Sequence, residues 1–81
     1  MKNRLCDISP GDTAVISGMQ TRGSIRKRLR DMGLVEGTQV ECLMKSPLGD
    51  PVAYLIKGAV IALRHEDAAS VTVEEIHTWK M

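Results

Sequence analysis

Short apolar stretches, separated by clusters of Gly, Pro, Asp and Ser, run through most of the chain. Several of them alternate with polar residues at the two-residue period of a β-strand. Strands are therefore predicted at residues 13–17, 38–45, 52–56, 59–63 and 70–74. Short strands at regular spacing are typical of a small barrel or sandwich. We expect a mainly β domain of about five strands.

One segment has a helical period instead, and it lies between the first two predicted strands. Ser24 is its candidate N-cap residue. Gly33 stands where a helix ends in a left-handed residue, and Leu34 can fold back on the last turn. A single helical turn is predicted at residues 65–69, before the last strand. The apolar stripe of the long helix consists of Ile25, Leu29 and Met32.

The stretch from residue 52 to residue 63 is apolar on both of its faces. Lys57-Gly58 is too short for anything but a tight hairpin turn, which pairs Ile56 with Ala59. Side chains alternate between faces, so this register sorts them into two sets. The larger set, expected to face the core, is Val52, Tyr54, Ile56, Ala59, Ile61 and Leu63. The second face carries Ala53, Leu55, Val60 and Ala62.

Two apolar residues close to this hairpin break the pattern around them. Leu43 interrupts the polar side of its strand, and Leu48 is held in the turn between two prolines. Both can extend the second face of the hairpin. In the strand of Leu43, alternation places Thr38, Val40, Cys42 and Met44 together on the other face.

Composition narrows the class of protein. The 81 residues include no Phe, one Tyr and one Trp, so the core must be aliphatic. A net charge of +1 does not suggest a nucleic-acid binder or an anionic-membrane binder. Cys6 and Cys42 fit no metal or redox spacing. No secretory signal or membrane span is visible, so we expect a cytoplasmic protein without direct membrane insertion.

The sequence shows few residues in patterns that are typical of catalysis or metal binding. No Ser or Cys is visibly paired with a His, and no phosphate-binding glycine loop is present. We therefore expect no enzymatic activity and no dedicated cofactor. His65, Glu66 and Asp67 are weak candidates for binding ferrous or another divalent ion, because consecutive residues converge poorly on one ion. The simpler interpretation is a charged helical turn at the surface.

Binding is the remaining class of function. The second face of the hairpin needs a cover, which could be the helix, the C-terminal tail, a second copy or another protein. Partner contacts are predicted at Leu48, Ala53, Leu55 and Val60. The basic side of the helix is a weaker second candidate, with Arg26, Lys27 and Arg30.

Four motifs in order resemble one known family. They are L-x-D-x-x-P-G at residues 5–11, R-L-x-D-M-G-L-x-x-G at 28–37, P-L-G-D-P at 47–51 and G-x-x-I-A-L-R-x-x-x-A at 58–68. Each is weak alone, but their order and spacing closely resemble the FeoA family of bacterial ferrous iron uptake. The resemblance covers residues 5–74. We therefore expect a single domain at residues 1–75 and a tail at 76–81 that includes Trp79.

The resemblance implies an SH3-like β-barrel with a helix after the first strand. It also implies an accessory or regulatory role beside FeoB, a membrane transporter with a cytosolic GTP-binding domain. Similar domains form the C-terminus of DtxR-type repressors. Family hairpins tend to be polar at positions like Ala53, Leu55 and Val60, which are apolar in this chain.

Three hypotheses stay open at this point. The first is a non-enzymatic module that binds a cytosolic region of FeoB, with possible self-association through the 52–63 hairpin. The second is a module that senses ferrous iron by binding it directly near His65. The third is a regulator of the GTPase activity of FeoB, for which Arg26 or Arg30 could reach the nucleotide.

Overall fold

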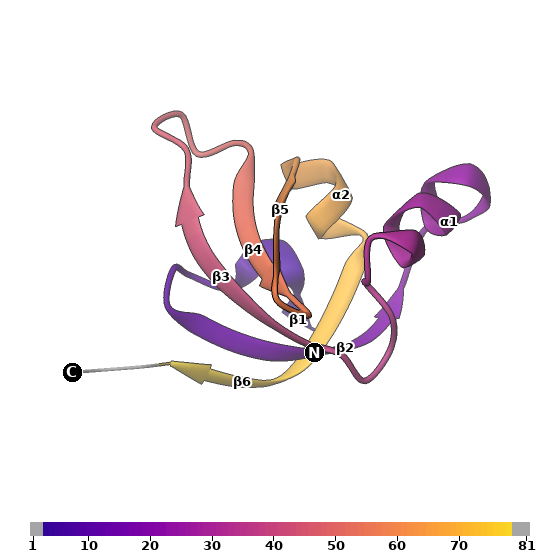
Figure 1. Ribbon diagram of the computed structural model, residues 1–81, viewed down its shortest axis with the longest axis horizontal. Coiled ribbons are helices and arrows are strands. Elements are labelled where there is room, and N and C mark those ends of the chain that lie inside the picture. The colour runs from indigo at the N-terminus through magenta and orange to yellow at the C-terminus, as the bar shows by residue number, and fades with distance from the viewer. Residues whose placement is uncertain (1–2, 79–81) are drawn as a thin grey trace.

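The computed structural model describes residues 3–78, and its strands form one curled sheet (Figure 1). All neighbouring strands are antiparallel, in the order β1-β6-β2-β3-β4-β5. The predicted mainly β architecture is confirmed, with one short strand more than expected. The strands are β1 (Asn3–Arg4), β2 (Asp12–Met19), β3 (Gln39–Lys45), β4 (Val52–Ile56), β5 (Ala59–Leu63) and β6 (Val71–Thr78). The helical elements are η1 (Leu5–Asp7), α1 (Gly23–Asp31) and α2 (His65–Ala69).

The last strand crosses the predicted domain boundary at residue 75. Its end pairs with the start of β2, where Thr13 lies opposite His77 and Asp12 lies opposite Thr78. Residues 74–78 are exposed, so burial imposes no apolar pattern that the sequence could display. The rest of the predicted tail, with Trp79, lies outside the described residues.

The core is aliphatic apart from Tyr54 and Cys42, and Tyr54 is its one aromatic member among the described residues. Its least expected member is Leu5, which is fully buried in the single turn of η1. The hydroxyl of Tyr54 donates a hydrogen bond of 3.4 Å to the carbonyl oxygen of Leu5. One turn of helix is too short to show a period, so the sequence did not predict η1.

Helix α1 ends as predicted but begins earlier. The N–H of Leu34 donates to the carbonyl of Leu29 at 3.1 Å, and Gly33 has a φ of +103°, which together are features of a Schellman motif. Its N-cap residue is Arg22, which has extended backbone, so Ser24 lies inside the first turn and its prediction as N-cap is wrong. Of the predicted stripe, Ile25 is 45% exposed and Leu29 is fully buried.

The predicted helical turn is confirmed as α2, and it is tied to a distant turn. The N–H of His65 donates a hydrogen bond of 2.8 Å to the Asp50 carboxylate. Asp50 therefore satisfies one of the free N–H groups at the start of this helix. The contact joins the 46–51 turn between β3 and β4 to the segment that follows β5.

Candidate protein interface

The β4–β5 hairpin has the predicted register from end to end. Ile56 lies opposite Ala59, and Val52 lies opposite Leu63. Lys57 and Gly58 have φ angles of 50° and 81°, as in the type I′ turn that suits a two-residue hairpin. Because the turn fixes the register, it also fixes which side chains share a face.

The inner face of this hairpin supplies much of the core. Its buried members are Val52, Tyr54, Ile56 and Leu63. Ile61 is partly buried and packs against the core. Ala59 is exposed, so the prediction that it faces the core is wrong. Ala59 lies next to the turn on β5, and no further strand of the described part of the chain covers that edge of the sheet.

A β-bulge in β3 moves Met44 to the outer face. Cys42 pairs with Tyr54 and Met44 pairs with Ala53, so Leu43 is an extra residue between two paired positions. One extra residue reverses the alternation that follows it. Met44 is therefore 63% exposed, and the prediction that it shares a face with Cys42 is wrong.

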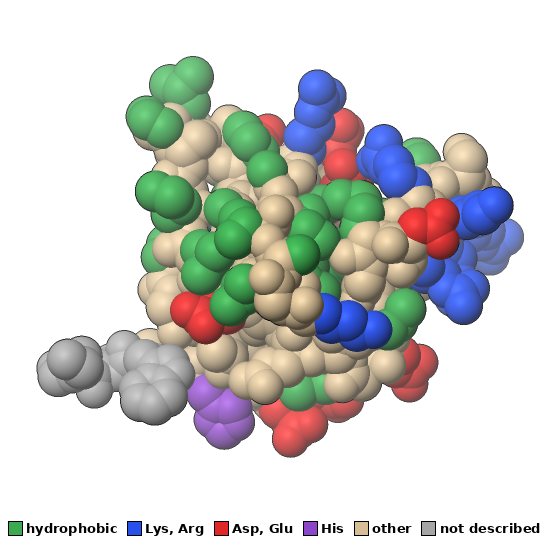
Figure 2. All heavy atoms as spheres, in the orientation of Figure 1, with side chains coloured by type: hydrophobic (Ala, Val, Ile, Leu, Met, Phe, Trp, Pro, Cys, Tyr) green, Lys and Arg blue, Asp and Glu red, His purple; other side chains and the backbone are tan. Residues whose placement is uncertain are grey.

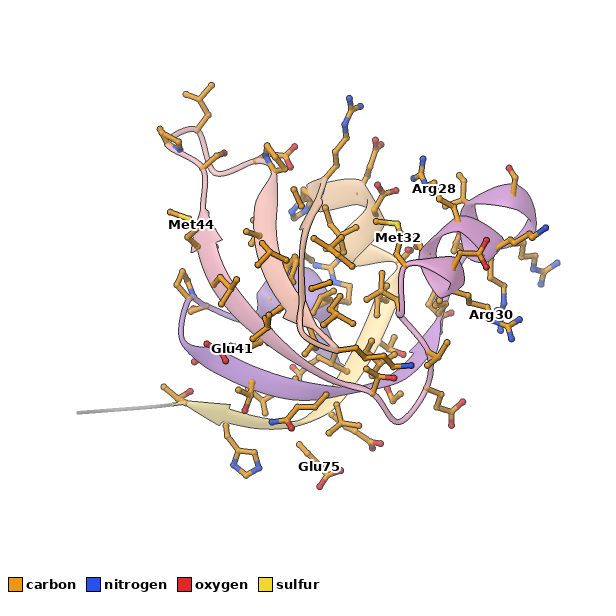
Figure 3. All side chains as sticks on the ribbon, in the orientation of Figure 1. Arg28, Arg30, Met32, Glu41, Met44 and Glu75 are labelled. Carbon is orange, nitrogen blue, oxygen red and sulfur yellow. The ribbon has the colours of Figure 1, made fainter. Side chains whose placement is uncertain are left out.

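The outer side of β3, β4 and β5 carries a group of neighbouring apolar side chains, which we call the outer patch, and Glu41 of β3 lies beside it, opposite Leu55. Val60 is 66% exposed within it. Figure 2 shows apolar side chains gathered over these strands, and in Figure 3 the Met44 side chain points away from the sheet. Such surfaces usually mark interaction sites. The outer patch consists of Met44, Ala53, Leu55, Val60 and Ala62.

Leu48 lies beyond this patch, at the tip of the 46–51 turn, and is 95% exposed. The turn is internally hydrogen-bonded, from Ser46 N–H to the Pro51 carbonyl at 3.1 Å and from Gly49 N–H to the Ser46 carbonyl at 2.8 Å. The Asp50 contact to α2 holds it from the other side. Leu48 is thus an exposed apolar side chain on a turn that hydrogen bonds hold in place.

The basic side chains of α1 form a separate exposed region. Arg26, Lys27 and Arg30 are all exposed on this helix. Lys and Arg side chains gather at the α1 end of the molecule in Figure 2, whereas Met44 lies at the opposite end in Figure 3. The structure therefore divides the predicted contact residues between two regions, and α1 does not cover the outer patch.

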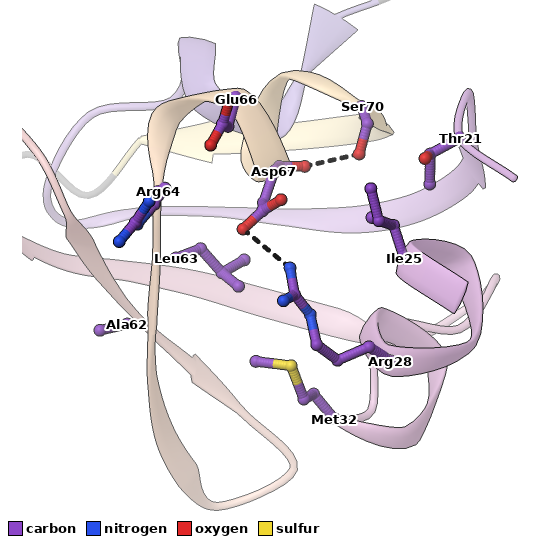
Figure 4. A pocket seen from close by; sticks show the side chains of 10 residues that line it. All are labelled: Thr21, Ile25, Arg28, Met32, Ala62, Leu63, Arg64, Glu66, Asp67 and Ser70. Atoms are coloured by element: carbon purple, nitrogen blue, oxygen red, sulfur yellow. Dashed lines mark hydrogen bonds and ion pairs between the residues drawn. The ribbon is translucent and has the colours of Figure 1, made fainter. Parts of the chain in front are cut away.

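A groove of about 740 Å³ separates α1 from β5 and α2 (Figure 4). The guanidinium of Arg28 bridges it to the carboxylate of Asp67, with 3.3 Å between Nη2 and Oδ2. These two residues are 39 positions apart in the chain, so no local pattern indicated the groove. Its apolar lining is Ile25 from α1, Met32 directly after that helix, and Ala62 and Leu63 from β5.

The thiols and the phenol near the core are held in their neutral forms. Burial raises the pKa of the Cys42 thiol. Burial, and then the nearby Asp7 carboxylate, raise the pKa of Cys6. Burial also raises the pKa of the Tyr54 hydroxyl. A thiol with a raised pKa is a weak nucleophile at neutral pH, so these cysteines are unsuited to nucleophilic catalysis.

The metal candidates have other contacts. Asp67 pairs with Arg28, and the backbone N–H of His65 is bonded to Asp50. Among residues 3–78, no three His, Cys, Asp or Glu side chains are grouped as metal ligands would be. Metal binding at His65, Glu66 and Asp67 stays a prediction.

The family is decided by a match along most of the chain. Residues 3–75 match the FeoA domain family. The chain belongs to the FeoA family. A Fe(2+) transport protein A/Fe(2+) transporter FeoB fusion protein of Porphyromonas gingivalis is 44% identical to it over 73 residues. That match covers 90% of this FeoA chain but only 9% of the fusion protein's length.

Solved structures confirm the SH3-like fold. FeoA of Stenotrophomonas maltophilia, in complex with zinc, is described as a prokaryotic SH3 domain protein; it has a TM-score of 0.82, 27% identity and 96% coverage of both chains. A manganese-dependent transcriptional repressor has a TM-score of 0.81 and 15% sequence identity. The match covers 90% of this FeoA chain and 40% of the repressor chain. At that identity the likeness concerns the fold alone, and it agrees with the predicted similarity to repressor domains.

Within residues 3–78, none of the helices has the length and apolar character needed to span a bilayer.

Proposed function

We propose that this FeoA-family protein is a non-enzymatic accessory protein of bacterial ferrous iron uptake and that it is located in the cytoplasm. It docks on a cytosolic region of a FeoB-type transporter and regulates it. The observation that carries the proposal is the outer patch, an apolar surface that no described element covers. The P. gingivalis fusion protein supports the choice of partner, because joining two binding modules in one chain raises their effective concentration.

The outer patch and Leu48 supply the binding energy in this proposal. Burying one exposed Leu or Val side chain is worth about 1.5–3 kcal/mol. The basic side of α1 contributes differently, because exposed charges at the rim of an interface mainly accelerate association and orient the partner. We therefore expect substitutions in the patch to change the dissociation rate, and substitutions at Arg26, Lys27 or Arg30 to change the association rate.

Calorimetric titration with the purified cytosolic domain of the cognate transporter tests this docking. The Leu55→Asp variant places a charge in the middle of the patch and should weaken binding at least tenfold, which is about 1.4 kcal/mol. Ile76→Asp is the matched control, since Ile76 is an exposed apolar residue on β6, away from the patch. Equal affinities for wild type and Leu55→Asp would contradict docking through the outer patch.

Regulation needs its own measurement. Ferrous iron uptake into vesicles that contain the full transporter should change in rate when this protein is added, and Leu55→Asp should abolish the change. The GTP hydrolysis rate in the same samples tests the narrower proposal that regulation acts through the nucleotide site. An unchanged uptake rate at saturating protein would contradict a regulatory role.

A further inference from the structure

Strand β5 leaves one edge of the sheet open. It is the last strand in the sheet order, so within residues 3–78 only its β4 side has a strand partner. All of its residues, Ala59–Leu63, are apolar. Proteins usually protect such an edge with proline, charged side chains or a covering segment. Within β5 itself there is no proline or charge.

The hairpin register identifies which backbone groups are free. In an antiparallel pair, residues alternate between positions that exchange hydrogen bonds and positions that do not. The two-residue turn makes Ile56 and Ala59 a bonded pair, so Ile61 and Leu63 also bond toward β4. Val60 and Ala62 therefore direct their N–H and C=O groups to the open edge.

The groove beside α1 meets this edge at the end of β5, where Ala62 and Leu63 line it. Ala62 and Leu63 point to opposite faces of the sheet, yet both line the groove. A groove lined from both faces of one strand lies along the side of that strand. Figure 4 shows β5 on one side and α1 on the other, with Arg28 and Met32 between them. A strand added to β5 would pass Val60 and then enter this groove beside Ala62, with α1 on its far side.

One exposed guanidinium favours an acidic side chain on the occupant. The charged lining residues balance in number, with Arg28 and Arg64 against Glu66 and Asp67. In the Arg28–Asp67 pair the Arg28 side chain is 59% exposed, whereas that of Asp67 is 17% exposed. A second carboxylate can therefore reach Arg28.

We propose that this groove binds an extended, apolar segment of the protein partner as an additional strand on β5, with an acidic side chain of that segment on Arg28. The identity of the partner rests on the proposed function, whereas the mode of binding does not. Backbone hydrogen bonds to Val60 and Ala62 hold the segment, as in other proteins that recognise a peptide by strand addition. The carboxylate on Arg28 fixes its position along the groove.

Amide hydrogen exchange of the full chain, followed by NMR, tests this directly. In the free protein the Val60 and Ala62 amides should exchange quickly, and those of Ile61 and Leu63 slowly. Saturation with the transporter's cytosolic domain should slow exchange at Val60 and Ala62 at least tenfold. Binding without this protection would overturn strand addition and leave the proposed function standing. Absence of binding would overturn both.

The same hydrogen-exchange measurement shows whether the groove is occupied by a second copy of this chain instead of the partner segment. If the Val60 and Ala62 amides become protected in the protein alone as its concentration rises, the edge pairs with another copy of this chain. That outcome would overturn the assignment of the groove to a segment of the partner.

A pair of variants at one position separates the backbone from the side chain. Ala62→Pro removes the N–H at the open edge, where proline is tolerated, and should weaken binding at least tenfold. Ala62→Val keeps the N–H and changes only the side chain, so it should lose clearly less affinity than Ala62→Pro. Equal losses in both variants would mean that the side-chain surface matters rather than the edge.

A second pair remains informative if Ala62→Pro does not fold. Arg28→Gln removes the proposed carboxylate partner and should weaken binding about tenfold. Asp67→Asn removes the internal competitor for Arg28 and should strengthen binding by severalfold. A merely structural ion pair would make both variants bind equally or lose affinity together, which would overturn the role of Arg28.

Discussion

The two faces of the β4–β5 hairpin have the same apolar character and opposite environments. Leu63 on the inner face is 2% exposed, whereas Val60 on the outer face is 66% exposed. The inner side chains meet Leu5 of η1, Leu29 of α1 and the loop residue Leu34 in one core cluster. No described element covers the outer side. Hydrophobicity identifies the hairpin, but the elements packed around it decide which face is buried.

The largest difference between the faces is expected in stability. Leu63→Ala removes a fully buried side chain and should lower the free energy of unfolding by about 2–5 kcal/mol. Val60→Ala on the outer face should change it by no more than about 0.5 kcal/mol. Urea unfolding of both variants measures this. Similar losses would mean that the outer face is also covered.

Alkaline pH should act on the core, where Cys42 and Tyr54 lie, and not on the outer patch, whose five residues have no titratable side chain. Burial raises the pKa values of Cys42 and Tyr54 above their ordinary values of 9.0 and 10.0, so the unfolded chain releases these protons first. Stability is therefore fully present below pH 9 and falls above it, by about 1.4 kcal/mol per pH unit for each group. Unfolding curves from pH 7 to 11 test this, and Tyr54→Phe should lessen the loss above pH 10.

The Leu55→Asp variant should leave the fold intact. Leu55 is only half-buried on the outer face, so the cost in stability should be about 1 kcal/mol or less. Sedimentation equilibrium of this variant against wild type also tests self-association, which should be lost if two copies meet through the outer patch. An unfolded Leu55→Asp protein would contradict the assignment of Leu55 to the outer face.

The smallest effect on stability is expected at the Lys57-Gly58 turn, which connects the two strands and belongs to neither face. Lys57 has a φ of 50°, a conformation that Asn adopts more readily. Lys57→Asn should raise the free energy of unfolding by about 0.5 kcal/mol without changing partner affinity. Thermal unfolding measures the gain, and a lowered melting temperature would contradict the strain assigned to Lys57.

Features with local causes could be predicted from the sequence. The Lys57-Gly58 turn set the hairpin register, and Gly33-Leu34 set the end of α1, because each depends on a few neighbouring residues. The predicted contacts at Ala53, Leu55 and Val60 all lie on the outer face for the same reason. Their role in binding stays a prediction.

Features that depend on distant partners could not be predicted. The bulge at Leu43 exists only relative to β4, so strict alternation misplaced Met44. The Arg28–Asp67 pair and the groove around it require α1 and α2 to meet. The end of β6 is exposed and pairs only because β2 continues beside it.

The two ends of the sheet are unequal, and this limits how copies can assemble. Among the described residues, β5 offers five residues at one end, whereas at the other end the short β1 pairs only with Thr72 and Val73 of β6. Growth of a filament by edge pairing needs two long, complementary edges on every subunit. The far edge of this sheet is divided between the short β1 and the exposed end of β6, where Glu75 has a φ of 51° that interrupts the extended backbone. It does not match the edge of β5, so the proposed strand addition joins one partner to each protein and does not continue into an open-ended polymer.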